Sequence, residues 1–213
     1  MQNQTPHHYI AVDGPIGAGK TTLARMLAEE MGAHLCLEPA EKNPFLAEFY
    51  KDRKRNAFKT QLFFLLNRYQ QQLELKQQDL FRPSVVADYT FAKDQIFAEI
   101  NLSEDERALY NTVFNLLRGQ LPKPDLVIYL RADSKVLVSR IKKRGYDYER
   151  PISADYLENL TDSYNRYFLN YSETPLLVVD TSNQNYLENP DDFAVLKRAI
   201  ASHKGGTVQL IAR

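Results

Sequence analysis

The chain has 213 residues, long enough for one well-buried core, and we expect a single domain over residues 1–213. Its 27 Lys and Arg balance 27 Asp and Glu, so no global field would hold a nucleic acid, and any attraction for phosphate must be local. No stretch is long and apolar enough to cross a membrane, and the single cysteine, Cys36, cannot form an internal disulfide, so we expect a cytoplasmic protein without membrane partners.

Short apolar runs alternate with longer segments of helical periodicity along the chain. The apolar runs predict strands, in chain order, at 8–12, 33–38, 84–89, 125–130 and 175–180. The periodic segments predict helices at 20–31, about 55–80, 104–118, 134–144, 154–171 and near 191–202, with Ser103 and Glu106 forming a capping box. Near-continuous apolar strands are typical of a parallel sheet covered on both faces, so we predict an α/β fold with five parallel strands.

The first strand and helix are joined by a glycine-rich stretch with the spacing G-x-x-x-x-G-K-T. Glycines let backbone N–H groups curl round an anion, and the start of the helix adds its positive end. Lys20 can reach β- and γ-phosphates, while the Thr21 hydroxyl can hold Mg²⁺. A plain strand-to-helix turn is the less favoured interpretation. We predict a P-loop that binds a nucleoside triphosphate through Gly14, Pro15, Ile16, Gly17, Ala18, Gly19, Lys20, Thr21 and Thr22.

Acidic residues end the second and third predicted strands, where ligands gather in doubly wound folds. Glu38 would face the γ-phosphate and could accept the proton of an attacking hydroxyl. Asp88 would join Thr21 around Mg²⁺. The alternatives are a surface acid at 38 and a solvated turn aspartate at 88.

The long predicted helix carries Gln61, Phe64 and Arg68 on one face, apart from its leucine-rich core stripe. An amide, an aromatic ring and a guanidinium together suit a flat heteroaromatic ligand, and a glutamine amide can pair with a purine edge. The alternative is a helix that is buried on one side and solvated on the other. Spacing alone does not decide between the two.

Arg140 and Arg144 lie one helical turn apart just before Gly145. Such arginines can close over phosphates and supply charge in a transition state, so we predict a lid at about 140–150. A solvated basic face is the alternative.

Taken together, these segments resemble the deoxynucleoside kinases, and in particular their bacterial deoxyadenosine/deoxyguanosine kinase branch. The resemblance covers nearly the whole chain. It rests on GPIGAGKTT at 14–22, LEPAEKNPFLAEFY at 37–50, FKTQLFFLLNRY at 58–69, VVADYTFAKDQIFAE at 85–99, PKPDLVIYL at 122–130 and RIKKRGYDYE at 140–149. The chain departs from many members in having Asp-Tyr-Thr at 88–90 instead of Glu-Arg-Ser or Asp-Arg-Ser, and Tyr146 where many lids have a third arginine.

The resemblance implies roles for individual residues. Glu38 would be the base for the sugar 5′-hydroxyl, and Arg140 and Arg144 would be the lid arginines. The residues expected to bind the nucleoside are Glu38, Tyr50, Gln61, Phe64, Arg68, Asp88, Asp94 and Glu149, with Gln61 reading the base edge and Tyr50 and Glu149 binding the 3′-hydroxyl. The loop at 180–185, including Asp180 and Asn183, would touch the adenine of ATP.

The predicted function is the Mg²⁺- and ATP-dependent 5′-phosphorylation of a purine deoxynucleoside for nucleotide salvage, by an enzyme that the family implies is a homodimer. One alternative is a nucleoside-monophosphate kinase, which would need more arginines near the long helix to hold an acceptor phosphate. Another is a nucleotide-binding regulator, although no Asn-Lys-x-Asp motif for guanine occurs. The preference for adenine or guanine stays open, because a glutamine amide can turn either edge toward a base.

Overall fold

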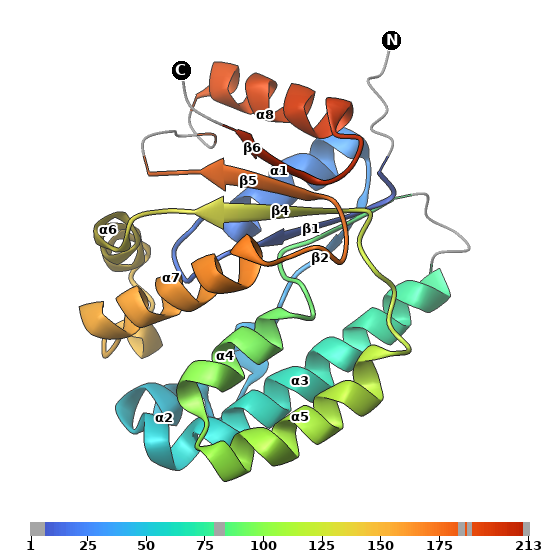
Figure 1. The fold of residues 1–213 in the computed structure, drawn as a ribbon. Coiled ribbons are helices and arrows are strands. Elements are labelled where there is room, and N and C mark those ends of the chain that lie inside the picture. The colour runs from blue at the N-terminus through green and yellow to red at the C-terminus, as the bar shows by residue number, and fades with distance from the viewer. Residues whose placement is uncertain (1–6, 79–83, 183–185, 187–188, 211–213) are drawn as a thin grey trace.

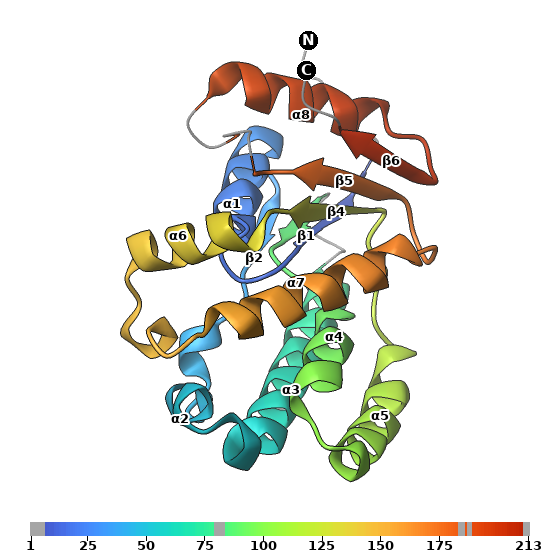
Figure 2. The same ribbon diagram turned by 60° about the vertical axis from the view of Figure 1, so that its left-hand side comes forward.

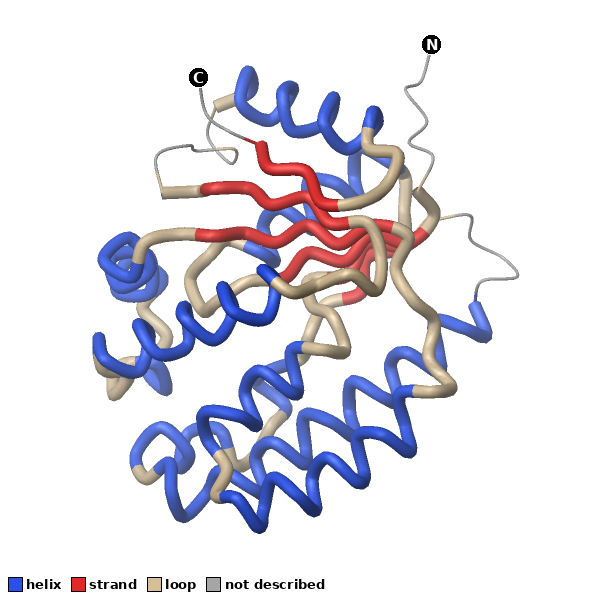
Figure 3. Tube along the Cα trace, viewed as in Figure 1, coloured by secondary structure: helices blue, strands red, loops and turns tan. Residues whose placement is uncertain are grey.

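A parallel sheet runs through the centre of the protein (Figures 1 and 3). The computed structural model describes residues 7–78, 84–182, 186 and 189–210. The strands are β1 (Tyr9–Asp13), β2 (His34–Cys36), β3 (Val85–Ala87), β4 (Leu126–Arg131), β5 (Leu176–Asp180) and β6 (Thr207–Leu210), in the spatial order β2-β3-β1-β4-β5-β6. All pairs of neighbouring strands are parallel. The α/β fold class is therefore confirmed.

The sheet has one strand more than the five that the sequence predicts. The additional strand, β6, pairs with β5 at the edge of the sheet and follows Gly205 and Gly206. Its first three residues are exposed, so it lacks the apolar run that marks a buried strand. The prediction of five strands was wrong because it searched only for that pattern.

The helices are α1 (Lys20–Met31), α2 (Leu46–Lys51), α3 (Arg53–Gln78), α4 (Lys93–Asn101), α5 (Glu104–Arg118), α6 (Ser134–Arg144), α7 (Ala154–Leu169) and α8 (Pro190–Ser202), with short 3₁₀ turns η1 (Ala40–Lys42) and η2 (Asp147–Glu149). The expected capping box at the start of α5 is present. The short helices α2 and α4 were not predicted. No helix among the described residues combines the length and apolar character needed to span a membrane.

Helices cover both faces of the sheet (Figure 2). On one face, α1 and α8 pack on the strands through Leu23, Leu27, Leu196 and Ile200. On the other face, α4 and α7 bury Ile96, Tyr164 and Phe168 against β4. A third cluster joins α2, α3 and α5 beyond this layer. Because β1, β3 and β2 are adjacent and parallel, their carboxyl ends carry the P-loop, Asp88 and Glu38 to one edge of the sheet.

Candidate active site

The P-loop curls between β1 and α1 in a conformation that requires glycine. Gly14 has φ 150°, and a Cβ there would lie 2.5 Å from the carbonyl oxygen of Leu130. Gly19, at φ 95°, precedes the first residue of α1, Lys20. The Lys20 ammonium folds back on the loop and donates to the carbonyl oxygens of Gly14 and Pro15, at 2.8 and 2.9 Å. A glycine-rich turn, a helix start and a cation thus meet in one loop, which is the arrangement that binds phosphates.

Lys20 lies among other charged groups. Burial and the nearby charge of Lys93 lower the pKa of its ammonium to about 8, while the carboxylates of Asp13, Glu38 and Asp88 oppose that shift. A bound polyphosphate would add negative charge and favour the protonated form.

Asp88 links the P-loop to the end of β2. The Thr21 hydroxyl donates to one oxygen of Asp88 at 2.5 Å, and the backbone N–H of Glu38 donates to the other at 2.8 Å. A hydroxyl and a carboxylate side by side are hard oxygen donors that suit Mg²⁺. In the part of the chain that the structure describes, no group of three or more His, Cys, Asp and Glu side chains could hold a metal ion. A Mg²⁺ ion bound by one carboxylate, a hydroxyl and substrate phosphates needs no such group, so these residues fit the ion.

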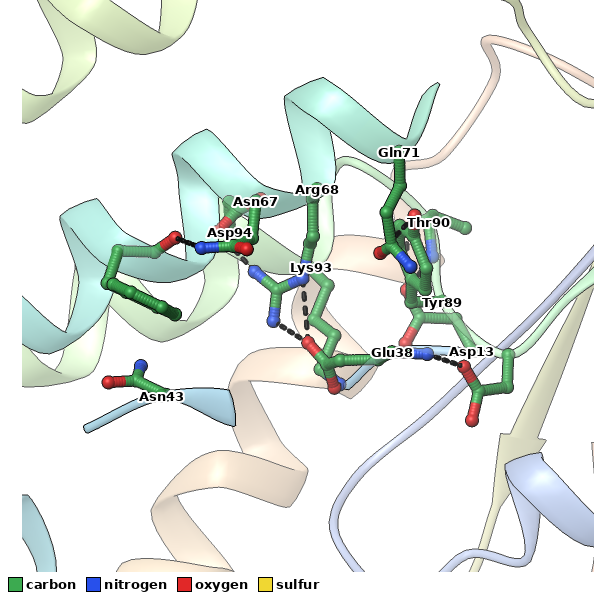
Figure 4. Close-up of polar contacts among 12 residues, drawn as sticks. Asp13, Glu38, Asn43, Asn67, Arg68, Gln71, Tyr89, Thr90, Lys93 and Asp94 are labelled. Atoms are coloured by element: carbon green, nitrogen blue, oxygen red, sulfur yellow. Dashed lines mark hydrogen bonds and ion pairs between the residues drawn. The ribbon is translucent and has the colours of Figure 1, made fainter. Parts of the chain in front are cut away.

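Two cations hold the carboxylate of Glu38 (Figure 4). Arg68, from α3, donates through Nε to Oε1 at 2.7 Å and also reaches that oxygen through a terminal nitrogen. Lys93, from the start of α4, donates to Oε2. Burial alone would raise the pKa of Glu38, but the two charges and their hydrogen bonds outweigh it and lower the pKa to about 2. Glu38 is therefore ionised at neutral pH, with its oxygens fixed in direction.

Arg68 shares its charge with a second carboxylate, that of Asp94. Asp94 is fully buried, pairs with Arg68 and accepts a hydrogen bond from the hydroxyl of Tyr110 at 3.1 Å. Burial raises the pKa of Asp94 to about 6; the charge of Arg68 opposes this rise and that of Glu38 adds to it. Asp94 is buried more deeply than Glu38 and has no second cation in contact, so its carboxyl group ionises less readily than that of Glu38.

The base-reading face predicted on α3 is partly assembled in the structure. The guanidinium of Arg68 lies 4.9 Å from the centre of the Phe64 ring, so these two side chains contact one another. Gln61 is buried on the same helix. An aromatic surface, a cation and a buried amide thus occupy one helix.

Tyr50 and Glu149, which are distant in sequence, come together at the predicted lid segment. The ring of Tyr50 stacks on that of Tyr148 at 6.4 Å, and burial, followed by the neighbouring Tyr156 and Glu149, raises the pKa of Tyr50 well above its ordinary value. Glu149 is buried and accepts two hydrogen bonds from Arg144, one of them from Nε at 3.2 Å. One predicted lid arginine therefore pairs with the carboxylate predicted to bind the sugar.

The other predicted lid arginine, Arg140, binds the loop that follows β5. It donates to the hydroxyl and the carbonyl oxygen of Thr181 at 3.0 and 2.6 Å. Asp180, the last residue of β5, pairs with Arg131 at 2.9 Å. Asn183 lies outside the described residues. Helix α6 itself lies against the P-loop, since a Cβ on Gly17 would come within 3.0 Å of it.

Comparison with known proteins identifies the family. The family model for deoxynucleoside kinases matches residues 10–203. The chain belongs to the deoxynucleoside kinase family. It is 38% identical over 200 residues to a deoxyguanosine kinase of Bacillus subtilis (strain 168), covering 92% of this chain and 95% of that protein. It is 34% identical over 198 residues to a deoxyadenosine kinase of Dictyostelium discoideum, covering 90% of this chain and 78% of that protein.

A solved structure agrees with these relatives. The structure of deoxyadenosine kinase from M. mycoides with bound dATP superposes with a TM-score of 0.79 and 30% identity, covering 92% of this chain and all of that one (100%). This kinase therefore phosphorylates deoxynucleosides. The alternatives of a monophosphate kinase and of a regulator without activity are set aside by the same findings.

Sequence reasoning missed three residues of the site in this deoxynucleoside kinase. The fully buried Asp13 accepts hydrogen bonds from the N–H of Gly14 at 2.7 Å, the N–H of Thr90 at 3.1 Å and the hydroxyl of Tyr164 at 3.2 Å, and so ties the P-loop to two other segments. Its place at the end of the first strand could have marked it. No sequence signal distinguishes Thr90 or Lys93 from ordinary loop and helix residues.

Proposed function

We propose that this kinase transfers the γ-phosphoryl group of ATP to the 5′-hydroxyl of a purine deoxynucleoside, deoxyadenosine or deoxyguanosine. The observation that carries the proposal is the position of Glu38. Its backbone is hydrogen-bonded to Asp88 beside the P-loop, and its carboxylate is bonded to Arg68 on the face that bears Phe64 and Gln61. A sugar hydroxyl at Glu38 would thus lie between the P-loop, which would bind phosphates, and the face of α3 that would contact the base.

Each end of the site has a role in this scheme. Lys20 and the P-loop N–H groups would bind the β- and γ-phosphates, and Thr21 and Asp88 would hold Mg²⁺, which when bound neutralises phosphate charge. Glu38 would receive the proton of the 5′-hydroxyl. Phosphoryl transfer has a loose transition state, so alignment and charge neutralisation supply most of the catalysis.

At the sugar and lid, we propose that Tyr50 and Glu149 bind the 3′-hydroxyl and that Arg140 and Arg144 turn toward the phosphates when ATP is present. Both arginines already lie on α6, which packs on the P-loop. Their hydrogen bonds to Thr181 and Glu149 would be exchanged for bonds to phosphate oxygens. Binding of a sugar to Glu149 would thereby help to free Arg144.

We further propose a cytoplasmic homodimer that acts as one domain with a lid at about 140–150. The single thiol, Cys36, is buried and unpaired with another cysteine, which suits a reducing compartment.

The purine preference is tested with Gln61→Leu. Without the amide, the polar edge of the base would be buried unpaired, which costs about 1–3 kcal/mol, so we expect the KM for deoxyadenosine and deoxyguanosine to rise about tenfold or more. The KM for ATP should stay unchanged. Gln70→Leu, at an exposed position of the same helix, is the matched control. Turnover is measured against the four deoxynucleosides, their ribose counterparts and their monophosphates.

Two outcomes would contradict the proposal. Equal losses for ATP and nucleoside in the Gln61 variant would remove that residue from base recognition. Faster turnover of pyrimidine deoxynucleosides than of purine ones by the unmodified enzyme would refute the purine assignment.

A further inference from the structure

Lys93 occupies a position that is unfavourable for a cation. It is only 6% exposed, and it is the first residue of α4, where the aligned backbone dipoles place positive partial charge. Its charge also acts on the P-loop ammonium of Lys20. A buried ammonium needs a carboxylate in contact, and Glu38 supplies one here.

Glu38 contacts both Lys93 and Arg68. Its Oε1 already accepts two hydrogen bonds from Arg68, and Lys93 adds a second cation on Oε2. Asp94 also pairs with Arg68, so two carboxylates face these two cations. Glu38 takes one of the three N–H donors of the Lys93 ammonium, which leaves two donors for another acceptor.

A chain of hydrogen bonds fixes the backbone of Lys93 relative to the P-loop. Its N–H donates to the carbonyl oxygen of Thr90 at 3.2 Å. Thr90 is bound in turn to Asp13, which accepts the N–H of Gly14 in the P-loop. Three consecutive contacts thus tie the start of α4 to the loop that would bind the triphosphate. Figure 4 shows Lys93 and Arg68 approaching Glu38 from different helices.

We infer that Lys93 is a catalytic residue whose ammonium donates a hydrogen bond to the phosphoryl group during its transfer. The inference rests on the proposed function, because it takes Glu38 as the group that meets the sugar hydroxyl. An ammonium has three N–H donors, so Lys93 can keep its bond to Glu38 and bind a phosphoryl oxygen with another. The oxygens of the incoming phosphoryl group are acceptors that the remaining N–H donors of Lys93 can bind.

The transfer makes one bond to phosphorus and breaks another. The bond between the sugar 5′-oxygen and the γ-phosphorus forms while the bond from that phosphorus to the β,γ-bridging oxygen breaks, and ADP leaves with the electron pair. The hydroxyl proton passes to Glu38. Lys93 keeps its proton throughout and meets the charge on the equatorial oxygens, where fixed donors act most strongly in a transition state.

The test compares Lys93→Met and Lys93→Ala with the unmodified enzyme. Removing one transition-state donor costs about 10²–10³-fold in kcat, so we expect a loss of that size, with KM for nucleoside and ATP changed less than about threefold. Ethylammonium, added to Lys93→Ala, should restore part of the turnover by occupying the vacated volume. It should not restore Glu38→Gln. Lys197→Met removes a lysine of α8 that pairs with Glu30, near the end of α1 that lies away from the P-loop, and it should leave kcat unchanged.

Binding of a fluorescent non-hydrolysable ATP analogue and thermal unfolding are measured for every variant. The inference is overturned if either Lys93 variant turns over at the unmodified rate. It is also overturned if both variants lose nucleotide binding and ethylammonium restores nothing, because Lys93 would then serve the fold. Failure of the proposed function would give a different result from failure of this inference. The unmodified enzyme would then phosphorylate no nucleoside, or Glu38→Gln would keep full turnover whatever the Lys93 variants do.

Discussion

Replacing Glu38 with glutamine should destabilise the free enzyme as well as inactivate it. Glutamine keeps the shape of the side chain but removes the charge that faces Arg68 and Lys93. Arg68 retains Asp94 as a partner, whereas Lys93 is left buried without a carboxylate in contact. Leaving a buried charge uncompensated in this way costs about 3–5 kcal/mol.

The lowered pKa of Glu38 gives a second value for the free energy by which its charge stabilises the folded enzyme. Its drop from 4.5 to about 2 corresponds to about 3 kcal/mol of stabilisation at neutral pH. Because the folded-state pKa is the lower one, the unfolded chain binds more protons in this range, and the stabilisation is present above 4.5 and lost as the pH falls toward 2. At about pH 3.5, about 2 kcal/mol of it should remain.

The assay is urea unfolding of both proteins without ligands, followed by far-UV circular dichroism because the chain has no tryptophan. We expect the difference in unfolding free energy to be about 3 kcal/mol at neutral pH and to shrink on acidification. Glu48→Gln, which removes an exposed pair with Lys51, should change nothing measurable. A glutamine variant as stable as the unmodified enzyme at neutral pH would refute the reasoning. Burying the charge of Glu38 would then cost at least as much free energy as its attraction to Arg68 and Lys93 contributes.

Two further predictions concern the P-loop and the buried thiol. Gly14→Ala should lose about 2 kcal/mol or more of stability and most ATP binding, because its Cβ would collide with the Leu130 carbonyl at 2.5 Å; Gly119→Ala, in open space, is the control, and equal effects in the two melting and binding measurements would contradict this. Burial raises the pKa of Cys36 to about 11, so its alkylation by iodoacetamide at about pH 8 should be slow in the folded enzyme and fast in urea. Rapid labelling of the native protein would contradict this, because it would show that the structure around Cys36 opens to the reagent.

The sequence by itself determined the features that depend on near neighbours in the chain. The P-loop needs glycines, a lysine and a threonine at fixed spacing, and these stand within eight residues. The capping box of α5 needs only Ser103 and Glu106. The buried strands of the sheet reveal themselves by apolar runs, and their parallel order carries Glu38 and Asp88 to the edge where ligands bind.

Only the tertiary structure decided which charges meet. Glu38 contacts Arg68 from 30 residues away and Lys93 from 55 residues away, and it is the packing of α3 and α4 beside the end of β2 that brings them together. The strand β6 pairs at an exposed edge without an apolar run to mark it. Spacing rules describe one helix or one turn at a time, whereas the energy of a buried ion depends on every charge around it, whatever its place in the chain.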